Sequence, residues 1–456
     1  MSGKSATAWS ERLPAHQRVF ANRNLRMSAI EAIGFDMDHT LALYRDKEFE
    51  GLCFDMAVDQ LVARGYPEDV RSVRYDRDTV VRGLVVDKRL GNILKLDAYG
   101  YVARVRHGGR LLDREERRSA YRRGGIRLGA DRYRVVDTLF DLPEGSLYTA
   151  LVALKDERPE LIKASYRTLF DDIRECIDTI HRNGSLKQRI MADLDRYFER
   201  DPDLALTLRL FRDVGKKLFV LTNSEPEYTG AVMSHVLDDE NWSDLFDLVV
   251  CSASKPGFFL SQGRGKRLAN PGVPGLPAVP GKVYTGGDAF FLESKLEALA
   301  DAILYFGDHT YGDILRSKKS VGWRTAMIVP EVEREILALD KVRDAVEELE
   351  EIEDNLEDLH RERERLEDAR QTEGRAIDGL DEYLRASLGR RSLLQGRIAS
   401  VLNQAWGSLF REGRAASRFG GQIRDVACVY TSRVSHFVHY PVEKFFVSAR
   451  ERLPHE

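Results

Sequence analysis

Two aspartates separated by a single residue are the feature of this sequence best suited to chemistry. Asp36 and Asp38 lie in the run DMDHT, directly after a short apolar stretch. Burying two neighbouring carboxylates is costly unless a cation or hydrogen-bond donors compensate them. A hard divalent cation such as Mg²⁺ prefers oxygen ligands and would also hold an incoming phosphate. We therefore expect Asp36 to attack phosphorus in line and Asp38 to act as general acid and base.

Three further polar clusters follow apolar runs later in the chain. The first contains Thr222, whose hydroxyl can donate to a phosphate oxygen, and the second contains Lys255, a compact cation able to neutralise charge around phosphorus. The third, GDHTYGD, contains Asp308, placed to complete a metal shell, and Asp313, placed to orient Lys255 or a water on the metal. Each cluster alone is weak evidence, but all of them in this order predict a phosphoryl-transfer site.

The apolar runs before these clusters have the length and composition of buried strands. They cover Ala32–Met37, Lys217–Thr222, Leu245–Cys251 and Ala302–Gly307. Helical patterns such as Leu204–Val214 and Phe291–Ala300 lie between them. Alternating strands and helices predict an α/β fold with a doubly wound parallel sheet, and ligands bind such sheets at the carboxyl ends of the strands.

About 170 residues separate the first predicted strand from the second, from Arg45 to Gly215, which is far more than a crossover needs. We expect an inserted α+β cap domain over the strand ends. A Gly/Pro-rich loop over residues 263–282 is expected near the site. The expected division is an N-terminal arm (1–30), a core (31–45 plus 205–335), a cap (46–204) and a helical C-terminal region (336–456).

The C-terminal region changes character after Pro330. Across the charged stretch near residues 340–395, apolar residues recur at a spacing of three to four amid dense Glu, Asp and Arg, which predicts an amphipathic helix. Two interpretations stay open for this stretch. It forms a helical hairpin or coiled-coil arm that meets another subunit, or it is a solvated helix packed on its own domain. The last 60 residues are rich in aromatic side chains and are expected to form packed helices rather than a free tail.

Composition excludes several classes of protein. The chain has 456 residues with 43% hydrophobic content, which rules out global disorder, and a net charge of −4, which does not indicate a broad surface for a nucleic-acid polymer. Its four cysteines form no CxxC pair. Neither an apolar signal-peptide core nor a run of about 20 apolar residues is present. We expect a soluble, cytoplasmic protein with no membrane partner.

Beyond these arguments, the four motifs resemble those of the haloacid dehalogenase-like phosphohydrolases, and longer segments resemble the cytosolic purine 5′-nucleotidases that prefer IMP and GMP. The resemblance is carried by GFDMDHTLALY, DTLFDLPE, DIRECIDTIHRNGSLK, LTNSEPEYT, SKPGFF and LYFGDHTYGDIL. It implies Mg²⁺-dependent hydrolysis of purine nucleoside monophosphates through an aspartyl phosphate on Asp36, with a nucleoside as a second phosphoryl acceptor. It also implies a homo-oligomer, either a dimer or a tetramer.

The same resemblance implies roles for individual residues. Mg²⁺ would be held by Asp36, Asp308 and the backbone carbonyl of Asp38, with Asp313 in support. Arg174, Asp178 and His181 would share one helix face. The substrate-binding residues would be Arg174 and Asp178 on the purine edge, His181 and Phe140 against the base, Lys187 by the phosphate or ribose, and Asn223 and Ser224 on the ribose or phosphate.

Simpler interpretations stay open for several of these residues. Arg174 and Asp178 have the spacing of an ordinary surface ion pair, and an isolated Phe140 would more commonly be a core residue. Two other functions also stay open. One is a phosphatase for another small phosphate ester, such as a sugar phosphate. The other is a non-catalytic helical scaffold, against which the full set of Asp36, Asp38, Lys255 and Asp308 argues.

Overall fold

The computed structural model describes residues 13–121, 126–260, 282–368 and 374–449. The chain forms two compact units, the first from residues 1–331 and 409–456 and the second from residues 332–408. The predicted loop over residues 263–282 lies almost entirely outside the described residues.

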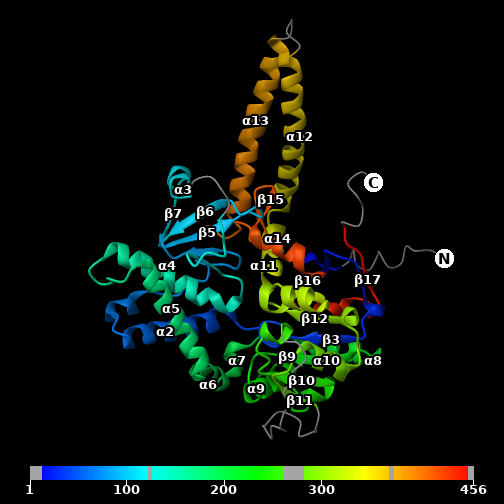
Figure 1. Cartoon of the computed structure of the whole chain (residues 1–456). Coiled ribbons are helices and arrows are strands. Elements are labelled where there is room, and N and C mark those ends of the chain that lie inside the picture. Colours follow the sequence, from blue (N-terminus) through cyan, green and yellow to red (C-terminus); the bar gives the residue numbers. More distant parts are fainter. Residues whose placement is uncertain (1–12, 122–125, 261–281, 369–373, 450–456) are drawn as a thin grey trace, which may run out of the picture. The chain divides into compact units, whose positions relative to one another are not determined.

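An eight-stranded sheet forms the centre of the first unit (Figure 1). Its strands, in spatial order, are β1 (Phe20–Ala21), β16 (Val429–Thr431), β13 (Arg324–Ile328), β12 (Ile303–Gly307), β3 (Ala32–Phe35), β9 (Lys217–Leu221), β10 (Leu248–Cys251) and β11 (Val283–Thr285). All pairs are parallel except β1 with β16. The central strands are buried along most of their length, as expected for apolar strands covered on both faces. The predicted α/β fold with a parallel sheet is confirmed.

The order of the strands reverses at one place. From β3 the chain continues outward through β9, β10 and β11, then crosses to β12 and continues the other way through β13 and β16. The helices that accompany these strands are α8 (Pro202–Asp213), α9 (Pro226–Leu237), α10 (Ala289–Leu296) and α14 (Arg418–Val426). The reversal between β3 and β12 is a topological switch point, where open α/β sheets bind their ligands.

Residues 409–449 differ in part from the sequence-based expectation. They were expected to be packed helices, and they contain α14, but they also contribute β16 to the main sheet. The N-terminal segment likewise contributes β1, which pairs antiparallel with β16 through Phe20 and Tyr430. Both strands have only two or three residues, which is too short for a detectable alternating pattern. A pair of short strands, β2 (Leu25–Arg26) and β17 (Phe445–Phe446), further ties the two ends of the chain together.

The segment inserted between β3 and β9 combines helices with a small antiparallel sheet in the order β7-β6-β5-β4-β8. Its strands are β4 (Val85–Asp87), β5 (Asn92–Leu96), β6 (Val102–His107), β7 (Arg110–Leu111) and β8 (Tyr133–Val135). Its helices are α2 (Asp46–Ala63), α3 (Arg114–Ala120), α4 (Leu142–Glu157), α5 (Tyr166–Arg182), α6 (Ser185–Met191) and α7 (Leu194–Tyr197). Helix α5 buries an apolar stripe that includes Leu169, Ile173 and Ile180 and packs on α2 and α4.

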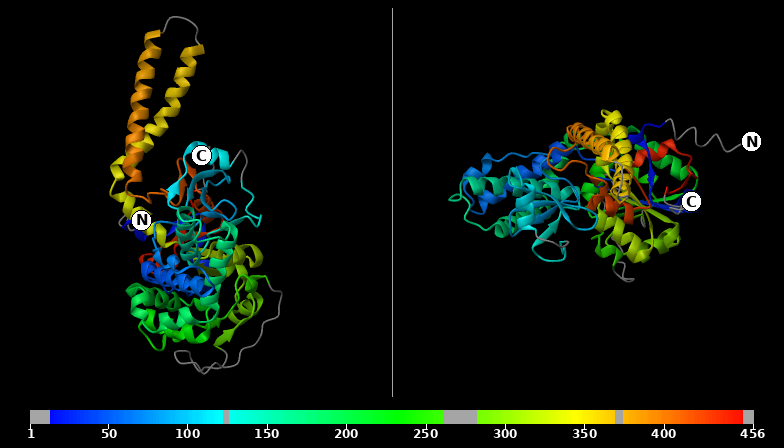
Figure 2. Two further views of the ribbon diagram at one scale, coloured as in Figure 1. Left: turned by 90° about the vertical axis from the view of Figure 1, so that its left-hand side faces the viewer. Right: turned by 90° about the horizontal axis from the view of Figure 1, so that it is seen from above.

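The second unit is a helical hairpin, made by α11 (Pro330–Asp340, which begins in the first unit), α12 (Arg343–Asp368) and α13 (Gly374–Ala399). Figure 2 shows α12 and α13 running alongside each other. Val342, Ala345 and Leu394 form its buried core. Acidic side chains of α12 pair with arginines of α13, as between Asp344 and Arg397 at 2.6 Å. No helix in the described part of the chain is long and apolar enough to span a bilayer.

Gly34 provides a test of how β3 is held in the sheet. A Cβ atom at this position would lie 2.0 Å from Cζ of Phe219, the buried residue opposite it on β9. We expect Gly34→Ala to lower the free energy of unfolding by about 1–3 kcal/mol, the usual cost of overpacking a core. Urea denaturation would measure the loss. Gly109→Ala is the matched control, because nothing lies within 4 Å of the added atom there, and equal stability of the two variants would contradict this account.

Candidate functional site

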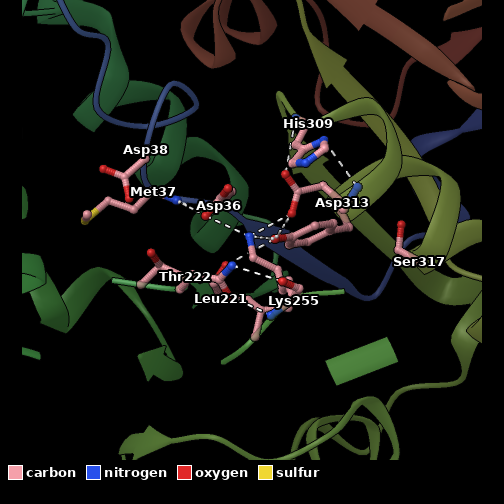
Figure 3. A network of polar contacts seen from close by, with 12 residues as sticks. Asp36, Met37, Asp38, Leu221, Thr222, Lys255, His309, Asp313 and Ser317 are labelled. Carbon is pink, nitrogen blue, oxygen red and sulfur yellow. Dashed lines mark hydrogen bonds and ion pairs between the residues drawn. The ribbon is translucent and has the colours of Figure 1, made fainter. Parts of the chain in front are cut away.

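The switch point brings the predicted motifs together at one edge of the sheet. Asp36 follows β3 and Asp308 follows β12, and because Phe35 and Phe306 are register partners, the two aspartates leave adjacent strands. The backbone N–H of Asp36 donates to the carbonyl of Phe306 at 2.8 Å. Thr222 follows β9, and Lys255 follows β10 by four residues. Figure 3 shows side chains from all four segments converging.

Lys255 lies at the centre of this cluster. Its Nζ atom lies 2.8 Å from Oδ1 of Asp36 and 2.7 Å from Oδ1 of Asp313, and it donates to the hydroxyl of Tyr305 at 2.9 Å (Figure 3). Burial by itself would lower the pKa of Lys255, but Asp313 and Asp36 together raise it. Burial raises the pKa of Asp36 well above its usual range, although Lys255 opposes that shift. The ammonium group is therefore charged at neutral pH and stabilises two buried carboxylates.

Asn223 holds the loop that carries Lys255. Its Oδ1 accepts the backbone N–H of Lys255 at 2.6 Å, and its Nδ2 donates to the carbonyl of the same residue at 3.2 Å. Thr222 is fully buried, and its Oγ1 accepts the backbone N–H of Ser224 at 3.0 Å. These residues were predicted only to contact substrate, and their contribution to the loop geometry was not foreseen.

The carboxylates form a group able to hold a metal. Within the described residues, oxygens of Asp36, Asp308 and Asp313 lie within 4.8 Å of one another. Oδ2 of Asp308 is buried and receives no hydrogen bond from any described residue. Burial, reinforced by Asp313, raises the pKa of Asp308 to about 7. Three hard oxygen donors with an unsatisfied buried oxygen fit Mg²⁺. The structure thus brings Asp313 into the candidate metal shell itself, beside the predicted Asp36 and Asp308.

The side chain of Asp38 has a different environment, which contains hydroxyl groups. Tyr44 donates to its Oδ1 at 2.7 Å, and Ser224 donates to its Oδ2 at 2.8 Å. The hydroxyl of Tyr228, on α9, lies 2.8 Å from that of Tyr44. Burial, followed by the charge of Asp38, raises the pKa of Tyr44, which therefore stays protonated and able to donate. Sequence reasoning missed both tyrosines, although Tyr44 lies only six residues after Asp38.

A pocket of about 320 Å³ adjoins this cluster, between the inserted segment and the core strands' loops. It is lined by eight of the predicted residues: Asp38, Phe140, Arg174, Asp178, His181, Lys187, Asn223 and Ser224. The pocket is not lined by the other predicted residues, whose side chains are buried: Asp36, Thr222, Lys255, Asp308 and Asp313. The volume is within the range of small-molecule sites. Lining residues that the sequence did not indicate include Tyr44, Tyr228, Arg134, Asp137, Asp141 and His309.

Aromatic rings form one side of the pocket. The ring of Phe140 meets that of His181 edge-on, with 5.8 Å between centroids, and packs against His39. Burial, followed by the nearby Lys187, lowers the pKa of His181 to about 4, so the imidazole is neutral near pH 7. Lys187 itself pairs with Glu225 and lies over the ring of Tyr228. The rings of Phe140 and neutral His181 offer an apolar surface against which a planar ring can stack.

Arg174 lies among three carboxylates. Its Nη1 donates to Asp141 at 3.0 Å and to Glu144 at 2.9 Å, and its Nε lies 3.3 Å from Asp178. Burial, followed by Asp141, raises the pKa of Glu144 to about 7. The i,i+4 ion pair between Arg174 and Asp178 is therefore present, and the same guanidinium also joins α5 to the start of α4.

Arg82 is a buried residue that supports the site and that sequence reasoning missed. It is 1% exposed, pairs through two nitrogens with Glu331 at 2.7 and 2.5 Å, and donates to the backbone carbonyl of Asp308 at 2.9 Å. Its guanidinium also lies over the ring of Phe419. This one side chain links the inserted segment to the loop that carries Asp308.

Comparison with known proteins adds independent information. The model of the 5′ nucleotidase family matches residues 19–456. A 5′-nucleotidase domain-containing protein of Dictyostelium discoideum is 29% identical over 459 residues, which cover 96% of this chain and 75% of that protein. A predicted phosphoglycolate phosphatase from Haemophilus somnus aligns with 66% of this chain and 86% of its own, at 14% identity and a TM-score of 0.30. An archaeal β-phosphoglucomutase from Pyrococcus aligns with 65% of this chain and 86% of its own, at 11% identity and a TM-score of 0.30.

Removal of Lys255 should expose the repulsion within the carboxylate cluster. We expect Lys255→Met to lower the free energy of unfolding by about 3–5 kcal/mol in EDTA at neutral pH, since it leaves buried charges unpaired. The deficit should shrink as pH falls, because burial raises the pKa of Asp36 above its unfolded value, so the folded variant takes up a proton there first.

Urea denaturation of the variant across pH would measure this effect. Adding Asp313→Asn to Lys255→Met removes one of the carboxylates that repel each other and should recover part of the lost stability. A Lys255→Met variant as stable as the unaltered protein at every pH would show that the cluster does not depend on this cation.

Proposed function

Because this chain belongs to the 5′-nucleotidase family, whose enzymes hydrolyse phosphate monoesters, we propose that it is a Mg²⁺-dependent nucleotidase for purine nucleoside monophosphates. We take IMP, GMP and their deoxy forms as its preferred substrates. The observation that supports this most strongly is the arrangement around Lys255. A charged ammonium joins Asp36 and Asp313 next to the unsatisfied oxygen of Asp308.

Asp36 is suited to act as the nucleophile. Its Oδ1 is held by Lys255 Nζ and by the backbone N–H of Met37 at 2.8 Å, while no described residue donates to its Oδ2. In the proposed first step Oδ2 attacks phosphorus, the bond from phosphorus to O5′ breaks, and protonated Asp38 gives its proton to O5′. An aspartyl phosphate and a free nucleoside result.

Asp38 is suited to serve both steps. In the second step it takes a proton from a water that attacks phosphorus, the bond to Asp36 breaks, and inorganic phosphate leaves. Tyr44 and Ser224 orient its two oxygens from opposite ends, so the carboxyl group keeps one position through both transfers. A nucleoside hydroxyl in place of water would give phosphotransfer, which we propose as a secondary activity.

Charge on the transferred phosphoryl group is balanced by fixed groups. Lys255 stays charged because Asp313 and Asp36 raise its pKa against the effect of burial. Asp36, Asp308 and Asp313 would hold Mg²⁺, which when bound neutralises negative charge on the phosphoryl oxygens. Thr222 and Ser224 offer hydroxyl groups beside the proposed position of the phosphoryl group. Such preorganised charges supply a large part of phosphoryl-transfer catalysis.

The groups that line the pocket favour a purine as the base of the nucleoside that leaves. Phe140 and neutral His181 supply ring surfaces, and Arg174 with its carboxylates supplies polar groups along one side. A volume of about 320 Å³ accommodates a nucleoside. We also propose that the protein works as a homo-oligomer, with the α12–α13 hairpin as a contact between subunits, and that it is cytoplasmic.

Phosphate release from a panel of substrates tests this proposal. IMP, GMP, AMP, CMP, UMP and p-nitrophenyl phosphate would be compared with Mg²⁺ and with EDTA, and Asp36→Asn would serve as the control for contaminating phosphatases. We expect the fastest release from IMP and GMP, with EDTA lowering the rate on the order of 100-fold or more, since a metal ion contributes several kcal/mol. Metal-dependent release without preference among bases would retain the phosphatase and exclude the purine assignment.

Arg174→Met separates recognition of the base from the chemistry. We expect kcat/KM for IMP to fall about 10- to 100-fold, the value of a hydrogen bond to a charged group, while turnover of p-nitrophenyl phosphate changes little. Steady-state kinetics on both substrates would measure the difference. Equal losses on both would favour a phosphatase for some other small ester.

A further inference from the structure

A second pocket, here called the basic pocket, lies in the inserted segment. Its volume of about 350 Å³ is close to that of the catalytic pocket beside Asp38. It is formed by the turn between β4 and β5, the residue before β8, the last turn of α4 and the first turn of α5. Five cations and, within the described residues, no carboxylate line it. The lining residues, none of which lines the catalytic pocket, are Lys88, Arg89, Arg132, Lys155, Ser165, Tyr166 and Arg167.

Three of the five cations are balanced by neighbouring carboxylates. Lys88 is 8% exposed, and its Nζ lies 3.2 Å from a carboxylate oxygen of both Asp131 and Asp171. Three cations face three carboxylates in this network, so these pairs fix the side chains in place but add no net charge to the pocket. The pairs are Lys88 with Asp131 and Asp171, Arg132 with Asp87, and Arg167 with Asp131.

The other two cations have no carboxylate partner among the described residues. Lys155 donates through Nζ to the backbone carbonyl of Ile162 at 2.7 Å. Arg89 donates to Asp87 through its backbone N–H at 3.1 Å, but no described residue accepts from its guanidinium. The side chains that line the pocket therefore carry an excess of two positive charges.

The start of α5 adds hydrogen-bond donors to these charges. Its N-cap residue, Ser165, accepts the backbone N–H of Thr168 through its side chain at 3.1 Å. No described residue accepts from the backbone N–H groups of Tyr166 and Arg167, because the first turn of a helix leaves such groups without an internal partner. The hydroxyl of Tyr166 is directed elsewhere, to Asp156 at 2.6 Å. Free N–H groups beside unpaired cations favour an anion with several oxygen atoms.

We propose that the basic pocket is a second ligand site, which binds a doubly charged phosphate group, either inorganic phosphate or the phosphate of a small monoester. A phosphate monoester carries a charge of about −1.5 to −2 at pH 7, which matches the excess of two positive charges on Arg89 and Lys155. A phosphodiester or a single carboxylate carries one charge and would leave the other cation unbalanced. The volume also leaves room for a small organic group beside the phosphate.

Hydrogen–deuterium exchange on the unaltered protein in EDTA tests the site directly. We expect inorganic phosphate to slow exchange in peptides that cover residues 88–91 and 165–168, and titration gives the Kd of the basic pocket. Peptides over residues 174–181 report on the catalytic pocket separately. Dimethyl phosphate, with one charge, should protect the first two peptides with a Kd at least about 10-fold higher.

Ribose 5-phosphate distinguishes the two sources of the phosphate group. A Kd below that of inorganic phosphate would identify a monoester as the ligand, and an equal or higher Kd would identify inorganic phosphate; both results support the site. If neither compound protects residues 88–91 and 165–168, the inference is overturned. Because this measurement does not depend on turnover, protection of these peptides in a protein inactive on every nucleotide would retain the inference and reject only the proposed function.

Arg89→Met and Lys155→Met remove the two unpaired cations one at a time. Each should raise the Kd of phosphate at the basic pocket about 10-fold, the value of a hydrogen bond to a charged group. Lys163→Met is the matched control, because Lys163 is an exposed cation of the same inserted segment that does not line the pocket. The same Kd in all three variants would show that phosphate is not held by these side chains and would overturn the assignment.

Discussion

The contact of Lys255 with Asp36 and Asp313 is the interaction on which the rest of this structure depends. Several carboxyl groups are buried at one edge of the sheet, and the ammonium group pairs directly with two of them. The groups that position this amine are therefore important for folding. They include Asn223, which holds the turn that carries Lys255, and the hydroxyl of Tyr305, which accepts from the amine. Unpaired buried charges would otherwise oppose folding.

The topology of the sheet is what makes such a cluster possible. Strands β3 and β12 are neighbours in the sheet although more than 250 residues separate them in the chain. Their carboxyl ends place Asp36 next to Asp308, and Arg82 fixes the second of these loops from the inserted segment. The insertion also supplies the pocket wall around Phe140 and Arg174. Chemistry and recognition thus come from different parts of one compact unit.

Sequence patterns predicted the long apolar strands and the polar residues after them, and the likeness to 5′-nucleotidases is confirmed by the family model. They did not predict β1 and β16, because two or three residues have no measurable period. They also missed Tyr44, Tyr228, Arg82 and Asp141. Tyr228, Arg82 and Asp141 act through partners distant in the sequence, and Tyr44 reaches Asp38 only through the turn between them; residue type shows neither property.

The sequence by itself determined the strand pattern, the order of the motifs and the residue types available for phosphoryl transfer, since these depend on local composition and spacing. Only the tertiary structure decided how those residues are partnered. It placed Asp313 in the carboxylate cluster, gave Asp38 hydroxyl donors, and surrounded Arg174 with Asp141, Glu144 and Asp178. The physical reason is that desolvation and hydrogen-bond satisfaction depend on all atoms around a group, most of which come from distant segments.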